Sequence, residues 1–224
     1  MGTGGSIVSF QKRGLKFSGK TVRKLMQQLG LKSPVRLKKY RSYREIWDSL
    51  QKISFSDSSK RKLPEKWVTD ITEFRAGGQK LYLSPILDLF NGEIVAWETA
   101  CRPTEELVKR MLNKGLESLA EGEKPLLHSD QGWHYRIKSY QSALADKGLV
   151  QSMSRKGNCL DNAVMENFFG HLKEEMYYRR DYRSVEELEN AVNEYITYWN
   201  QKRIKLSLGG LSPVEYRTEY QKAG

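Results

Sequence analysis

The middle of the chain alternates short apolar runs with polar turns, a pattern typical of a β-sheet. The first three runs predict antiparallel strands, because a glycine turn at 77–79 and the hairpin pair Asn91-Gly92 separate them. Two helical periods and two further apolar runs then predict βαβ connections and a mixed α/β sheet. The predicted strands are 66–74, 80–89, 93–99, 125–130 and 149–154, and the predicted helices are about 104–120 and 135–148.

The C-terminal third of the chain changes to a helical period. After a loop over 154–163, a helix is predicted from near Asp161 or Asn162. A second helix over 184–203 opens with a capping box, in which Glu187 follows Ser184 by three residues. Breaks at Gly209-Gly210 and Ser212-Pro213 end it and begin another. The apolar stripe of the first helix consists of Met165, Phe168, Leu172 and Met176, with Phe169 adjoining.

The first 65 residues are basic and only weakly patterned. One short helix is predicted in 18–34, with Ser18 or Thr21 as its cap and Gly30 as its stop. Residues 56–66 have the composition of a linker. We therefore expect two parts, a basic N-terminal segment over 1–65 and a core over 66–224.

Charge is distributed unevenly along the chain, which has a formal net charge of +11. Residues 1–66 hold 17 Lys and Arg against 4 Asp and Glu, whereas the remaining residues hold 21 against 23. A basic segment of this kind favours a polyanion, and nucleic acid above all, over the alternative of a solvated linker. No apolar stretch approaches the roughly 20 residues of a membrane span. Without a secretory signal or a disulfide framework, the chain is expected in the cytoplasm.

Three acidic residues stand where a sheet enzyme could use them. Asp70 is predicted in the middle of the first strand, Asp130 at the end of a later strand, and Glu166 in the first turns of a helix. Taken singly, each could be a satisfied polar residue, a cap or a solvated side chain. If they converge, the three carboxylates repel one another unless a divalent cation joins them. Oxygen ligands without a His or Cys cluster indicate Mg²⁺ or Mn²⁺.

The spacing of these acids and the residues around them resemble a known family. Between Asp130 and Glu166 lie 35 residues, and the blocks WVTDITEF, HSDQGWHY and SRKGNCLDNAVMENFFGHLKEE occur in order, followed by YWNQKRIKLSLGGLSPVEYR. The chain resembles OrfB-type transposases of bacterial insertion sequences, whose catalytic core belongs to the retroviral-integrase superfamily. The resemblance implies an RNase H-like fold: a five-stranded mixed sheet with helices on both faces, here preceded by a short basic helical segment.

The resemblance also implies a chemistry. Asp70, Asp130 and Glu166 would hold two Mg²⁺ or Mn²⁺ ions, with Asp70 bridging them, and catalyse strand cleavage and strand transfer at the ends of an insertion sequence. The partners would be terminal-repeat and target DNA in the bacterial nucleoid, and the protein would act as a multimer. Because the helix-turn-helix region before the core looks short, an upstream reading-frame product is a further expected partner.

Several side chains are expected to contact DNA. Lys173 lies two helical turns after Glu166, where the family carries a basic residue. The loop before that helix contributes Arg155, Lys156 and Asn158, and the N-terminal segment contributes Lys20, Arg23, Lys24, Lys38, Lys39 and Arg41. Around Asp130, the side chains of His128 and His134 could either orient a metal-bound water or pack. Trp133 and Tyr135 could either stack on a frayed base or be buried.

Two other functions stay open at this point. An RNase H-like or junction-resolving nuclease would use the same fold but would cut without joining. A DNA-binding fragment that inhibits a full-length transposase would need no chemistry at all.

Overall fold

The computed structural model describes residues 3–31, 66–153 and 163–223 of the chain. The predicted DNA contacts Arg155, Lys156, Asn158, Lys38, Lys39 and Arg41 therefore lie outside the described residues. Contacts divide the chain into two compact units. One comprises Tyr40–Glu194, and the other combines Met1–Lys39 with Tyr195–Gly224.

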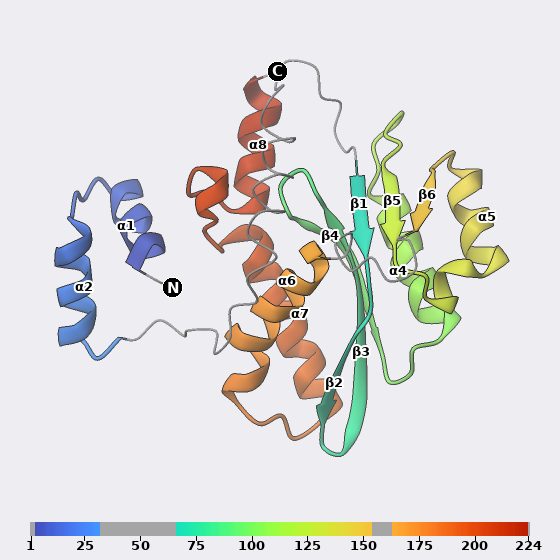
Figure 1. Cartoon of the computed structure of the whole chain (residues 1–224), viewed down its shortest axis with the longest axis horizontal. Helices are drawn as coiled ribbons and strands as arrows, with labels where there is room; N and C mark the ends of the chain where they lie inside the picture. Colours follow the sequence, from blue (N-terminus) through green and yellow to red (C-terminus); the bar gives the residue numbers. More distant parts are fainter. Residues whose placement is uncertain (1–2, 32–65, 154–162, 224) are drawn as a thin grey trace. The chain divides into compact units, whose positions relative to one another are not determined.

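The larger unit is built on a mixed sheet of six strands (Figure 1). The antiparallel pairings β1–β3, β2–β3 and β3–β4 are followed by the parallel pairings β1–β5 and β5–β6. This confirms the predicted mixed α/β sheet. The strands are β1 Lys66–Thr69, β2 Thr72–Ala76, β3 Gln79–Asp88, β4 Ile94–Ala100, β5 Leu126–Ser129 and β6 Gln151–Met153.

The expectation of five strands was wrong at one point, because the first predicted strand is two. β1 and β2 lie along the same edge of β3, and their register is continuous across the break: Thr69 is opposite Ile86 and Thr72 is opposite Leu83. Only Asp70 and Ile71 leave the strand conformation. Asp70 therefore lies in the interruption between two strands and not in the middle of one.

Helices cover both faces of this sheet (Figure 1). On one face, α4 and α5 pack over a core that includes the buried side chains of Trp67, Met111, Leu127 and Tyr140. On the other face, α6 lies against β1, and α7 bonds to β4 through the Trp97 indole and Asn193. The helical segments of this unit are α4 Glu105–Glu117, η1 Trp133–Arg136, α5 Lys138–Asp146, α6 Ala163–Glu175, η3 Tyr177–Arg179 and the start of α7 Val185–Gln201.

Two predicted helix starts need refinement. The helix expected from residue 135 begins at Lys138, because the preceding residues form the separate 3₁₀ turn η1. In the capping box of α7, the Ser184 hydroxyl accepts from the Glu187 backbone N–H at 3.1 Å, as expected. The Glu187 carboxylate, however, accepts from the backbone N–H of Arg183 at 3.0 Å.

The smaller unit contains the N-terminal helices together with the C-terminal end of the chain. Its segments are α1 Thr3–Lys12, α2 Gly19–Gln28, the end of α7, η4 Leu206–Leu208 and α8 Pro213–Ala223. Ser18 caps α2 as predicted, since its hydroxyl accepts from the Thr21 N–H at 3.1 Å. The sequence pattern did not predict α1, whose Lys12 ammonium donates to Glu215 at 3.0 Å. The predicted boundary at residue 65 lies outside the described residues and stays a prediction.

None of the helices that the structure describes is long and apolar enough to span a membrane.

The turn between β2 and β3 gives a direct test of this architecture. Gly77 has φ +54°, and a Cβ placed there would lie 2.4 Å from the Arg183 carbonyl oxygen, whereas Gly78 has φ +76° and open space around it. Gly78→Ala is expected to lower the free energy of unfolding by about 1–2 kcal/mol through backbone strain alone. Gly77→Ala is expected to cost about 1–3 kcal/mol more, because a backbone atom must move. Urea unfolding of both variants checks this, and equal losses would contradict the described contact.

Candidate active site

Sheet register brings two of the three predicted acids together. β1 and β5 are parallel neighbours in which Lys66 pairs with Leu126 and Val68 with His128. Continued by two residues, this register aligns Asp70 with Asp130, one residue beyond the end of each strand. The carboxyl ends of adjacent parallel strands are a common position for active-site side chains in α/β proteins.

Backbone donors orient both carboxylates. Oδ1 of Asp70 accepts the N–H of Ile71 at 2.8 Å, and Oδ1 of Asp130 accepts the N–H of Gly132 at 2.8 Å. A Cβ at Gly132 would lie only 2.8 Å from that Asp130 oxygen, so a side chain at this position would displace the carboxylate. Both aspartates are partly buried. Each carboxylate is thus held in place by the chain that leaves its strand.

The phenol of Tyr135 is buried, and its pKa depends on the charges of both aspartates. The Tyr135 side chain is 1% exposed. Burial raises the pKa of its hydroxyl well above the usual value, and the neighbouring Tyr140, Asp70 and Asp130 raise this pKa further. The alternatives for Tyr135 are thereby resolved in favour of burial.

Glu166 lies on a neighbouring element and is exposed. It occupies the first turn of α6, as predicted, and α6 lies against β1, the strand that ends at Asp70. Within the described ranges, no three His, Cys, Asp or Glu side chains are grouped closely enough to hold a metal ion. The structure therefore pairs two aspartates and presents the third acid from the adjacent helix.

The donor set at this edge suits a hard divalent cation. Asp70 and Asp130 supply only carboxylate oxygens, which Mg²⁺ and Mn²⁺ prefer. The nearby His128 is engaged elsewhere, since its Nδ1 lies 3.0 Å from the Ser152 hydroxyl on β6. His134 donates from Nε2 to the Pro103 carbonyl oxygen at 2.8 Å. Packing is thus the interpretation that the structure favours for both histidines.

Comparison with known proteins gives the family. An integrase core domain model matches residues 60–159, and a second integrase core domain model matches residues 166–220. The chain is 47% identical over 213 residues to the putative transposase InsK for insertion sequence element IS150 of Escherichia coli K12, covering 95% of this chain and 75% of that protein. The chain belongs to the integrase-core family of insertion-sequence transposases.

A second member agrees with this assignment, and a viral integrase core has a similar fold. An uncharacterized transposase-like protein of Haemophilus influenzae is 49% identical to this integrase-core chain over 206 residues, which cover 92% of this chain and 95% of that one. The fold is similar to that of the HTLV-2 integrase catalytic core domain in complex with magnesium, with a TM-score of 0.53 at 17% identity. The match covers 70% of this chain and 99% of that one, and confirms the expected RNase H-like architecture.

In this integrase core the Lys173 side chain is less exposed than we expect of a side chain that extends into solvent to contact DNA. It is half-buried, and its Nζ lies 5.4 Å from the centre of the Phe74 ring on β2. Burial lowers the pKa of its ammonium, and the charge of Glu73 opposes that shift. By contrast, Lys20, Arg23 and Lys24 on α2 are exposed. Their contact with DNA, like that of Lys173, remains a prediction.

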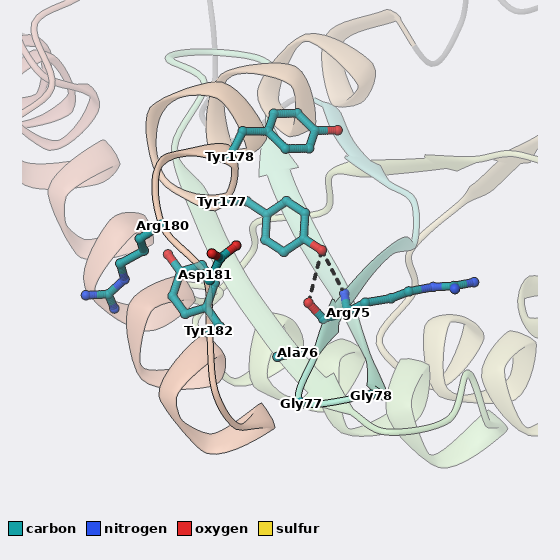
Figure 2. Close-up of a pocket in the computed structure, with 9 residues that line it drawn as sticks. All are labelled: Arg75, Ala76, Gly77, Gly78, Tyr177, Tyr178, Arg180, Asp181 and Tyr182. Atoms are coloured by element: carbon teal, nitrogen blue, oxygen red, sulfur yellow. Dashed lines mark hydrogen bonds between the residues drawn. The ribbon is translucent and has the colours of Figure 1, made fainter.

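A hollow of about 460 Å³ lies away from the aspartates, beside the β2–β3 turn and η3 (Figure 2). The Tyr177 hydroxyl fastens one side, donating to the Arg75 carbonyl oxygen at 3.0 Å and accepting from its N–H at 3.1 Å. The Arg75 side chain extends away from Tyr177 and Tyr182. None of the three candidate acids lines this hollow. We interpret the pair of hydrogen bonds between Tyr177 and Arg75 as the joint that fixes the end of α6 to β2.

This joint yields a stability prediction. Tyr177→Phe removes both hydrogen bonds and is expected to lower the free energy of unfolding by about 1–2 kcal/mol. Tyr178→Phe is the matched control, because that side chain is 65% exposed and its loss of a hydroxyl should change stability by less than about 0.5 kcal/mol. Thermal and urea unfolding of both variants measures the difference. If the Tyr177→Phe protein were as stable as wild type, the structural role that we assign to η3 would be wrong.

Proposed function

We propose that this transposase catalyses metal-dependent cleavage of DNA strands at the ends of an insertion sequence and joins the freed strand to a target. The alignment of Asp70 with Asp130 at the ends of two parallel strands carries the proposal. Relatives named as insertion-sequence transposases support the substrate class. The fold neighbour solved with magnesium supports a divalent metal.

The proposed site uses all three acids. Asp70 and Asp130 would hold one ion between them, and Glu166, from the first turn of α6, would complete a second site that shares Asp70. When bound, the ions would supply Lewis-acid chemistry, lowering the pKa of the attacking hydroxyl and stabilising the leaving 3′-oxygen. The chain itself fixes the carboxylates through the N–H groups of Ile71 and Gly132. In-line displacement at phosphorus needs positioned charge more than covalent help.

The proposal extends to partners. The net charge of +13 in residues 1–66 would attract the phosphate backbone, so the N-terminal segment would bind the terminal repeats. Lys173, Arg155, Lys156 and Asn158 would contact DNA nearer the acids, and the protein would act as a multimer in the bacterial nucleoid. An upstream reading-frame product would add end recognition.

Substitution of each acid tests the proposal. Asp70→Asn, Asp130→Asn and Glu166→Gln are each expected to lower Mg²⁺- or Mn²⁺-dependent nicking and joining of a terminal-repeat duplex by at least about a hundredfold, because each removes a charge that the transition state needs. Asp146→Asn is the control, since Asp146 is exposed at the end of α5. Strand joining at the wild-type rate by all three variants would contradict the assignment of these acids as catalytic residues.

The same assay separates the competing functions. A protein that nicks but never joins is a nuclease of the same fold. A protein that binds the repeat and inhibits an active transposase, with inhibition unchanged in Asp130→Asn, is a regulator. Either result would overturn strand transfer as the function.

Gly132 gives a second test that leaves all three acids in place. Gly132→Ala puts a methyl group against the Asp130 carboxylate, which must then rotate away from its backbone donor. We expect at least about a tenfold loss of strand transfer, since displacements near 1 Å in an active site are costly. Gly122→Ala, at an open position with φ +85°, is the control for general stability. Normal activity with normal folding in Gly132→Ala would show that Asp130 needs no such orientation.

A further inference from the structure

An exposed aromatic side chain stands beside the paired aspartates. Trp133 is 58% exposed, three residues after Asp130, in the same turn whose Tyr135 is fully buried. Exposed tryptophan forgoes the burial of a large apolar surface, so an ordered one next to a site indicates a ligand. Its chain neighbours Gln131 and Arg136 are exposed and polar, which favours a polar ligand over an apolar protein surface.

The Trp133 indole stacks against the imidazole of its neighbour in the turn. The Trp133 ring lies 3.9 Å from the His134 ring, centre to centre, with 32° between their planes. His134 is itself fixed through Nε2 to the Pro103 carbonyl oxygen. The Tyr135 carbonyl oxygen accepts from the Gln151 side-chain amide at 2.8 Å, which ties the turn to β6. One face of the indole is thus braced by an imidazole while the side chain remains open to solvent.

The position of Trp133 and the charged residues after it indicate which ligand the indole binds. Three residues of chain separate the Cα atoms of Asp130 and Trp133 by at most about 11 Å, and successive nucleotides of a duplex strand rise about 3.4 Å, so the indole is within reach of the few nucleotides on either side of a phosphate held at the aspartates. Arg136 and Lys138 follow it and are exposed, which adds cations for phosphates beside a flat aromatic surface for a base. Aromatic platforms with adjacent cations are the usual means of binding unpaired bases.

We propose that Trp133 stacks on an unpaired DNA base within three nucleotides of the phosphodiester that is cleaved. This inference rests on the proposed function, because it takes the aspartate pair as the place where that phosphate binds. Stacking requires a base whose face is accessible, so the DNA must fray or extrude a base at this point. The indole would thereby help to fix the scissile strand over the carboxylates.

Abasic substrates test the stacking directly. Terminal-repeat duplexes carrying one abasic site at each of the three nucleotides on either side of the cut are bound without added metal by wild type, Trp133→Ala and Trp133→Phe. On intact DNA, Trp133→Ala is expected to lower affinity about tenfold, and Trp133→Phe much less. At one position, removal of the base should abolish the difference between wild type and Trp133→Ala. Tyr178→Ala, which truncates an aromatic side chain of similar exposure on η3, should bind every duplex as wild type does.

Fluorescence of 2-aminopurine placed at that same position gives an independent reading. Wild type should quench it on binding, and Trp133→Ala should not. A loss of affinity that is the same on every duplex would overturn the proposal and make Trp133 a structural residue. A change of oligomeric state in Trp133→Ala without DNA, with no position-dependent effect, would overturn it in favour of a protein interface.

The two proposals can fail separately. Binding and quenching require no chemistry, so a wild type that shows the position-dependent effect but never cuts contradicts only the proposed function. A wild type that cuts and joins without that effect contradicts only the role of Trp133.

Discussion

The parallel pairing of β1 with β5 is the contact on which the rest of the site depends. It places two aspartates at the same level, one residue past the end of each strand. Two carboxylates so placed offer only hard oxygen ligands, which divalent cations such as Mg²⁺ prefer. β1 can take this central position because β3 pairs with its other edge and helices cover both faces. The fold thus builds a local concentration of negative charge that favours metal binding.

Much of this fold could be predicted from the order of apolar runs, glycine turns and helical periods. The hairpin at Asn91-Gly92 and the caps at Ser18 and Ser184 are local signals, and the structure contains them. The break at Asp70 was not predictable in the same way. The residues on both sides of it continue one register along β3, so the pattern reads as a single strand. Only the departure of Asp70 and Ile71 from the strand conformation separates β1 from β2.

Other features depend on distant contacts that no local pattern contains. Helix α1 has the sequence TGGSIVSFQK, whose two glycines oppose helix formation, yet Lys12 at its end pairs with the distant Glu215. The fates of Trp133 and Tyr135 were equally open on sequence, since both are large aromatics in one motif. Their separation into an exposed ring and a buried one follows from the 3₁₀ turn, which directs neighbouring side chains to different surroundings.

The joint at Tyr177 has a mechanical consequence for the third acid. Its hydroxyl ties the C-terminal end of α6 to the backbone of β2, while Glu166 lies at the opposite end of that helix. From Glu166 to the end of α6 at Glu175 the helix is about 14 Å long, so a tilt of about 10° around the joint would carry Glu166 through about 2 Å. A motion that small at one end of a rigid rod is enough to bring a carboxylate into or out of a coordination shell.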